Sequence, residues 1–423
     1  MQTRSIELKS GLSKTVLAGI CAVGIALALI FAKWAFGHAV AVNAVKPEVT
    51  ALGVDLAASD PSGHFNFAQQ LEKTLLHEDQ QRSLAEYESA AALSPHNYIY
   101  WLGLARAREQ AGNDVLAEGS LRKAEELAPN YSRVQWALGN FLLRRGQRNE
   151  GFEKIRKAVA ADEAFAAPAA AAAWQIFEGD IQQIHAAVGD SPRINAAIAV
   201  LLAGDKRYPE AMDFWRRVSA GGALNDRKAA GQAVYQKLLA GGAYRSAIEV
   251  AGDAGLFPDW DVSVGAVSNG GFETGLHSLR DGSHPFSWVV ADGSFPRIGQ
   301  NMDQKRSGTY SLLISFGQGG SGQRTVSQKI GVEPEAGYDL QFYYRSDVAT
   351  SARLRCDVFS ASGASLAGAA LPAAGDWTQM KLPISVPANI EGIEIRIGME
   401  GCSANGCTAS GNVWFDDLSL SKH

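Results

Sequence analysis

The sequence lacks the features that mark several common classes of protein. Its formal net charge is -5 and its pI is about 6.0. A protein that follows nucleic-acid phosphates carries a concentrated basic excess, so we exclude that partner. The sequence has no Gly-x-Ser-x-Gly elbow, His-Glu-x-x-His helix or P-loop. Residues 317–322 match the dinucleotide glycine pattern by letters, but a strand is expected to follow at residues 325–332 where that site needs a helix.

Cysteine is also scarce. Cys21 lies in an apolar N-terminal stretch, whereas Cys356, Cys402 and Cys407 lie near the C-terminus. Cys402 and Cys407 flank a Ser-Ala-Asn-Gly loop, a spacing that predicts a small disulfide in an oxidising compartment. A zinc site is the weaker interpretation, because it needs four Cys or His ligands and no histidine is near. Cys356 would then be a buried free thiol, although pairing with either neighbour stays open.

Charge is absent from residues 15–32, which are long enough to span a bilayer. Residues 15–37 are therefore predicted to form one transmembrane helix, with Lys33 and Trp34 at the interface. The cations of residues 1–14 predict that this tail is cytoplasmic and that the remainder is periplasmic, as in a single-pass protein of a bacterial inner membrane. The alternative is a signal peptide cleaved near residues 39–44, where small residues occur.

Residues 38–64 are predicted to be a linker, and residues 65–257 to be helical repeats. Pro95 and Pro129 are separated by 34 residues, as are Gly112 and Gly146. This period resembles the tetratricopeptide repeat (TPR), whose helix pairs stack into a solenoid with a groove for a protein partner. Large side chains of the repeats are interpreted as packing residues, namely Trp101, Trp136 and Phe152.

Residues 261–423 are rich in Gly, Ser and Thr, with short runs in which apolar and polar residues alternate. Residues 338–344, 354–358 and 393–399 show this alternation most clearly. A period of two predicts antiparallel strands with one buried face, so we expect a β-sandwich.

Several phrases in this region resemble the jelly-roll carbohydrate-binding modules of families 4, 9 and 22. They are Asn-Gly-Gly-Phe-Glu at residues 269–273, Gly-Thr-Tyr-Ser-Leu at 308–312 and Val-Trp-Phe-Asp-Asp-Leu-Ser-Leu at 413–420. The resemblance implies a structural calcium held by an opening Glu and a closing Asp, which are Glu273 and Asp416, with Asn269 and Asp417 nearby. The alternative is that these acids cap turns.

Sugar recognition needs exposed rings that stack on pyranose faces, with polar side chains around them. On Tyr343 and its solvated surroundings we place a candidate carbohydrate site, whose members are Tyr343, Arg345, Arg355, Arg396 and Trp414.

The predicted fold is thus a multidomain α plus β chain: a transmembrane helix, a TPR-like α-solenoid and a C-terminal antiparallel jelly roll. The leading hypothesis is a non-catalytic scaffold that holds a protein in the TPR groove and polysaccharide on the jelly roll during envelope or exopolysaccharide assembly or export. Two alternatives remain. One is a glycan-active enzyme, which would need two carboxylates within about 5 to 9.5 Å of each other. The other is a purely structural assembly factor, which an occluded Tyr343 face would favour.

Overall fold

The N-terminal helix α1 (Gly11–Asn43) leads a chain that divides into two units, Met1–Gly189 and Asp190–His423. The structure is a computed structural model that describes residues 11–74, 76–221, 224–258, 260–278, 284–317, 324–350, 352–400 and 409–423. Within them, α1 is the one helix long and apolar enough to cross a membrane, with a window of mean hydropathy 2.6 in residues Lys14–Asn43. Length and composition make it a candidate membrane span or signal sequence.

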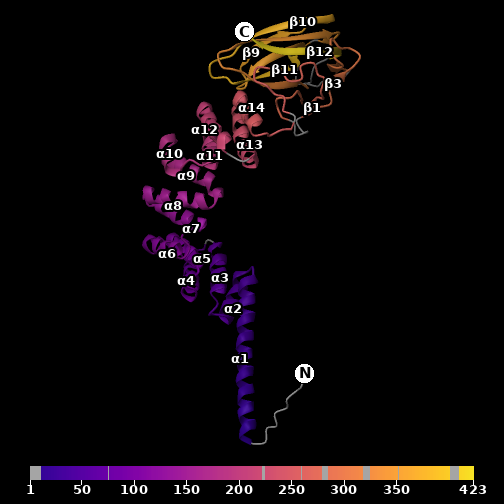
Figure 1. Ribbon diagram of the computed structural model, residues 1–423. Coiled ribbons are helices and arrows are strands. Elements are labelled where there is room, and N and C mark those ends of the chain that lie inside the picture. The colour runs from indigo at the N-terminus through magenta and orange to yellow at the C-terminus, as the bar shows by residue number, and fades with distance from the viewer. Residues whose placement is uncertain are drawn as a thin grey trace, which may run out of the picture. The chain divides into compact units, whose positions relative to one another are not determined.

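The predicted linker at residues 38–64 is wrong, because this segment is helical and packed. Helix α1 continues to Asn43, and α2 (Pro47–Leu56) and α3 (Pro61–Glu72) pack beside its C-terminal part (Figure 1). A Cβ atom at Gly53 would collide with the backbone of Ala41, so the absent side chain is what lets α1 and α2 approach so closely. The Asn66 amide also donates to the Ala41 carbonyl at 2.6 Å. Gly53 and Ala41 are therefore close-packing residues of a helical cluster.

The helical repeats of the first unit follow the 34-residue period. Gly112 and Gly146 both adopt positive φ angles, 75° and 78°, in the turns between paired helices, which confirms the predicted turns. Pro95 and Pro129 follow the ends of α4 and α6, as predicted. The helices are α4 (His77–Leu93), α5 (Tyr98–Gln110), α6 (Asp114–Leu127), α7 (Ser132–Arg144), α8 (Arg148–Ala161), the short η1 (Glu163–Phe165), α9 (Ala166–Ile176) and α10 (Ile181–Val188).

The second unit begins with four more helices and ends in the β-sandwich. The helices are α11 (Pro192–Gly204), α12 (Tyr208–Gly221), α13 (Leu224–Gly241) and α14 (Tyr244–Asp253). Helical structure thus ends close to the predicted limit at residue 257, although the last helices belong with the sandwich in one unit.

The sandwich consists of two largely antiparallel sheets, as predicted. One has the strand order β1-β2-β5-β11-β8-β9 and the other β10-β6-β12-β4-β3, with β7 paired to β12. The strands are β1 (His277–Ser278), β2 (Val289–Val290), β3 (Arg297–Asn301), β4 (Ser311–Phe316), β5 (Val326–Gly331), β6 (Gly337–Ser346), β7 (Ala349–Thr350), β8 (Arg353–Ser360), β9 (Ser365–Ala370), β10 (Ala374–Ser385), β11 (Gly392–Glu400) and β12 (Ala409–Lys422).

The alternation predicted for three strands is confirmed. The residues interpreted as inward-facing are buried in one core between the sheets, except Met399, which is partly buried against it: Tyr338, Leu340, Phe342, Tyr344, Leu354, Cys356, Val358, Ile393, Ile395 and Ile397. Strand β5 also confirms the strand expected after the glycine-rich loop, whose residues 318–323 lie outside the described part of the chain.

Helix α14 packs against one end of strands β5 and β11. The Glu391 carboxylate accepts a hydrogen bond from the Ser246 hydroxyl at 2.6 Å and pairs with Arg245 at 2.9 Å. A side chain at Gly331 would meet the Arg245 backbone, and one at Gly392 would meet the ring of Tyr244. The glycines permit helix and sheet to touch, so part of this sheet's outer face is covered by the helix.

Candidate functional site

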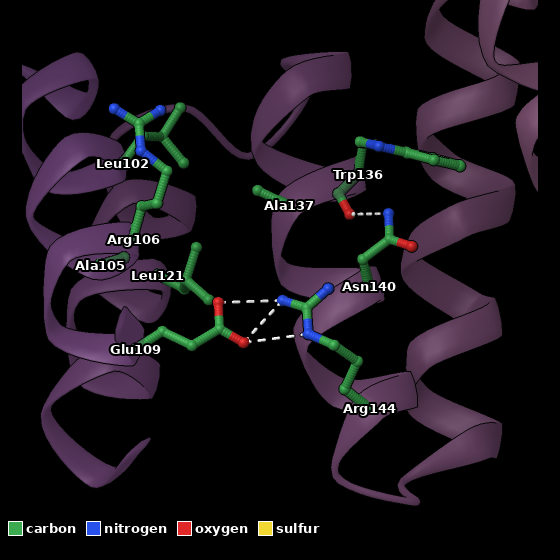
Figure 2. A pocket seen from close by; sticks show the side chains of 9 residues that line it. All are labelled: Leu102, Ala105, Arg106, Glu109, Leu121, Trp136, Ala137, Asn140 and Arg144. Atoms are coloured by element: carbon green, nitrogen blue, oxygen red, sulfur yellow. Dashed lines mark hydrogen bonds and ion pairs between the residues drawn. The ribbon is translucent and has the colours of Figure 1, made fainter. Parts of the chain in front are cut away.

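A groove with a volume of about 370 Å³ lies between α5 and α7 (Figure 2). We call it the α5–α7 groove. Its apolar part consists of Leu102 and Ala105 from α5, Leu121 from α6, and Trp136 and Ala137 from α7; its polar part consists of Arg106, Glu109, Asn140 and Arg144. Apolar floors with a few placed polar groups are typical of binding sites.

The repeat places these polar side chains. Glu72, Arg106 and Asn140 are spaced at the 34-residue period, so they occupy equivalent positions on α3, α5 and α7. Stacking of repeats brings equivalent positions side by side along one face. Sequence reasoning missed these residues because it followed prolines, glycines and large apolar side chains; the same spacing applied to polar residues would have found them.

Ion pairs between neighbouring repeats set the charge of the groove. Both Glu109 oxygens accept hydrogen bonds from Arg144, the shortest at 2.7 Å (Figure 2). Arg106 pairs with Glu72 at 2.5 Å and also donates to the Tyr87 hydroxyl at 3.0 Å. Burial raises the pKa of Tyr87, so its hydroxyl stays neutral. The rim therefore offers guanidinium and carboxylate groups that are already oriented.

The packing residues predicted from the repeats have different surroundings. Phe152 is buried and stacks on Phe177 at 5.4 Å between ring centroids, as expected of a packing residue. Trp101 is half-buried against the α4–α5 core and donates to the Pro95 carbonyl at 2.9 Å. Trp136 is half-buried, stacks on Phe165 and lines the groove. Its indole is therefore a surface that a bound peptide could contact.

The residues predicted to hold calcium tie one end of the sandwich together. Glu273 accepts hydrogen bonds from the backbone N–H groups of Thr309 and Tyr310 at 2.9 to 3.2 Å. The amide of Asn269 closes its own turn by exchanging hydrogen bonds with the backbone of Thr274. Glu273 and Asn269 thus act at turns, the alternative that the sequence left open.

Asp416 and Asp417 hold the loop at residues 302–310. The Asp416 carboxylate is fully buried and accepts hydrogen bonds from the backbone N–H groups of Arg306, Ser307 and Asp417 at 2.8 to 3.1 Å. Burial raises its pKa, opposed by these donors. Asp417 pairs with the Arg306 guanidinium and accepts from the Ser307 hydroxyl at 2.6 Å.

The donor set fits calcium in part. The Glu273 and Asp416 side chains both lie near Gly271, and carboxylate oxygens are ligands that calcium prefers. Among the described residues there is no group of three or more His, Cys, Asp or Glu side chains that could hold a metal ion. Backbone carbonyls would have to supply the other ligands, so calcium at this position stays a prediction.

The five predicted sugar-binding residues do not form one face, which corrects the sequence-based grouping. Tyr343, Arg345 and Trp414 lie on β6 and β12, whereas Arg355 and Arg396 lie on β8 and β11 of the other sheet. The strand order of a jelly roll differs from the sequence order, and the alternation of one strand does not reveal which sheet it joins.

The Tyr343 ring is covered by its own chain. The Arg306 guanidinium lies 3.5 Å from the ring centroid, and Arg345 donates to Gln304 of the same loop at 2.7 Å. Arg345 also lies 6.0 Å from the centroid of the Trp414 ring. In this arrangement the predicted stacking of a sugar on Tyr343 is blocked, because Arg306 occupies the position over the ring that a pyranose would need.

Arg355 and Arg396 lie on the outer face of the β5–β11–β8 sheet. Arg355 pairs with Asp357 at 2.7 Å and Arg396 with Glu394 at 3.0 Å. These are surface ion pairs of the kind that polar ligands can replace at little cost.

Cys356, on the inner face of the same sheet, is a buried free thiol, as one interpretation of the sequence predicted, and burial raises its pKa. The predicted Cys402–Cys407 disulfide lies outside the described residues.

A TPR-like helical array and a C-terminal jelly roll define the class of this protein. No family model and no curated protein matches the chain. It is similar to a solved family 4 carbohydrate-binding module (14% identity, 37% of this chain, 99% of that chain, TM-score 0.29) and to TmCBM61 in complex with β-1,4-galactotriose (18%, 38%, 100%, 0.29). It is also similar to YrrB, a TPR protein with an unusual peptide-binding site (16%, 51%, 95%, 0.27).

Proposed function

We propose that this protein is a non-catalytic, membrane-anchored scaffold whose α5–α7 groove binds a segment of a partner protein. The observation that carries the proposal is the groove itself, where the half-buried Trp136 lies beside Asn140 and the apolar lining residues. An extended peptide could place an apolar side chain against the indole, and the amide oxygen of Asn140, whose NH2 group donates to the Trp136 carbonyl at 2.9 Å, could accept from its backbone (Figure 2).

The packing of α1 supports the anchor over a cleaved signal peptide. Ala41 of α1, at one candidate cleavage site, is fully buried against α2 and α3, and the Gln70 amide donates to the Ala44 carbonyl at 2.7 Å. Cleavage there would remove the helix against which α2 and α3 pack. The further proposal is a single pass in a bacterial inner membrane, with the N-terminus cytoplasmic and the remainder periplasmic.

The groove can be tested by photo-crosslinking in cells. A photoreactive amino acid replaces Asn140 in the full-length chain, and the matched control carries it at the exposed Ala160 of α8. We expect a crosslinked partner from the Asn140 position that is lost when Trp136 is changed to Ala. Equal products from both positions, or products insensitive to Trp136→Ala, would refute a groove-bound partner.

For the sandwich, we propose contact with polysaccharide during envelope or exopolysaccharide assembly or export, through the outer face that carries Arg355 and Arg396. Arg306 covers the Tyr343 ring, which instead favours a structural role for the sheet that contains β6. A glycan-array screen of the purified full-length protein, with and without a calcium chelator, tests this. Glycan binding should be lost in Arg355→Gln/Arg396→Gln and retained in Tyr343→Ala. If no glycan binds, the purely structural alternative is preferred.

A further inference from the structure

A second pocket in the first unit lies outside the α5–α7 groove. It has a volume of about 430 Å³ and lies between α8 and α10. We call it the α8–α10 pocket. Helix α8 contributes Arg148, Phe152 and Arg156, and the turn before α10 contributes Phe177. Positions i, i+4 and i+8 fall on one face of a helix, so two guanidinium groups flank a phenyl ring.

These two arginines differ from the other arginines around them. Arg106, Arg108, Arg122, Arg144 and Arg145 each form an ion pair with a carboxylate. In the described part of the chain, Arg148 and Arg156 have no carboxylate within ion-pair distance. Arg156 donates to the Ala187 carbonyl at 2.7 Å, and the Arg148 guanidinium lies 6.0 Å from the Phe177 centroid. Both side chains keep donors for an anionic ligand.

Three acids near this pocket in sequence are already engaged, and a fourth, the exposed Glu178 beside Phe177, forms no ion pair with Arg148 or Arg156. Glu150 pairs with Arg122 at 2.5 Å, and Glu153 pairs with Lys157 at 2.8 Å. Asp180 caps the N-terminus of α10 and accepts from the Gln183 amide at 2.8 Å. The positive charge of the pocket is therefore not cancelled by a direct partner, and it attracts negative charge from outside.

The pocket interior favours an apolar side chain over a sugar ring. Phe152 and Phe177 stack on each other at 5.4 Å with an interplanar angle of 24°, and Arg148 lies over the Phe177 ring. The ring faces that a pyranose would need are thus already occupied. The lining also includes Ala186, an exposed residue of α10. Such a surface suits a Leu or Val side chain.

We propose that the α8–α10 pocket binds an acidic peptide segment of a partner protein, with one carboxylate on Arg148, another on Arg156, and an apolar side chain between them. The two arginines are eight residues apart on α8, which corresponds to about 12 Å along a helix axis. Acidic residues four apart in an extended peptide are separated by about 13 Å. The best ligand is therefore an extended segment of the form acidic, any, apolar, any, acidic.

The test uses the full-length protein in detergent micelles and a fluorescein-labelled peptide, Asp-Gly-Leu-Gly-Asp. Fluorescence anisotropy measures its affinity at low and high salt. The double variant Arg148→Gln/Arg156→Gln should bind at least about tenfold more weakly, because charge-assisted hydrogen bonds are lost. Arg145→Gln, in the preceding turn and paired with Asp114, is the matched control and should bind as the parent does. Trp136→Ala, in the α5–α7 groove, should also bind the peptide as the parent does, because the peptide occupies the α8–α10 pocket.

Several results would overturn the proposal. They are an absence of peptide binding up to the solubility limit, equal binding by the double variant, and equal binding of the Asn-Gly-Leu-Gly-Asn peptide. If polygalacturonate displaces the peptide and replacing its Leu by Gly changes nothing, the pocket is an anionic polysaccharide site instead. Both arginines are exposed, so the substitutions should leave the melting temperature unchanged, and a circular-dichroism melt checks this.

Discussion

Replacement of Asp416 by Asn separates two explanations of the buried carboxylate at the closed end of the sandwich. Without a cation, burial raises the pKa of Asp416 even though three backbone N–H groups donate to it. A raised pKa means that the fold disfavours the charged form relative to the unfolded chain. An asparagine removes that charge but offers only one acceptor oxygen. In chelator we therefore expect Asp416→Asn to change the free energy of unfolding by no more than about 1 kcal/mol.

Calcium would reverse this balance. A bound cation would neutralise the Asp416 and Glu273 charges, and saturation at one hundred times Kd would stabilise the parent by about 2.7 kcal/mol. For a unit of this size, 1 kcal/mol corresponds to about 2–4 °C in Tm, so chelation should lower the parent's Tm by about 5–11 °C. The variant should show no such shift.

The assay is a thermal melt of the full-length protein with calcium and with chelator. Near-ultraviolet circular dichroism monitors the unfolding of the β-sandwich. Glu333→Gln is the control, since Glu333 pairs with Lys422 at the surface of the sandwich and is not among the predicted calcium ligands. If chelation leaves the parent's Tm unchanged, the calcium prediction is wrong. If Asp416→Asn is severely destabilised in chelator, the reasoning from burial is wrong.

Three further predictions concern the helices. The hydrogen bond to Glu86 raises the pKa of His64, which also contacts the Ala58 carbonyl. Protonated His64 therefore stabilises the folded chain fully below about pH 6.5, and this stabilisation is lost as pH rises through the higher folded pKa. Urea unfolding across this pH range should show the loss in the parent and not in His64→Gln. Gly53→Val should destabilise the α1–α2 pair by about 2 kcal/mol or more, measured by proteolysis within residues 44–60, whereas Leu52→Val at an exposed position of α2 should not. Glu391→Ala should cost about 1–3 kcal/mol, because the buried Ser246 hydroxyl loses its acceptor, and Glu391→Gln should cost less in the same urea titration.

Local periodicity explains how much of the fold could be predicted from the sequence. The 34-residue spacing of Pro95 and Pro129 reports a repeating helix pair, and the alternation around Phe342 reports a strand with one buried face. The segment at residues 38–64 was mispredicted because its small residues, such as Gly53, show no periodicity that reports helix packing. Only the tertiary contact between Gly53 and Ala41 decides between a linker and packed helices.

The candidate sites were harder to predict, because they depend on contacts between distant residues. Arg306 covers Tyr343 because Asp416 and Asp417, about 110 positions later in the chain, fix its loop. No spacing rule relates these positions. The α8–α10 pocket was missed for another reason, since an unpaired arginine is recognised only after the partners of all the other arginines are known.

The junction at α14 limits where the sandwich can bind a large ligand. Tyr244 packs against Gly392, and its ring centroid lies 6.0 Å from that of Phe286. Burial raises the pKa of Tyr244 to about 12. The helix therefore excludes water from the end of the sheet where β11 begins. Arg396 lies four residues farther along β11 than Gly392, and Arg355 lies on β8 opposite Gly398. A polysaccharide on this sheet would thus be confined to the arginine-bearing part, so shortening Arg396 should weaken binding more than any change at Lys329, which lies near Tyr244.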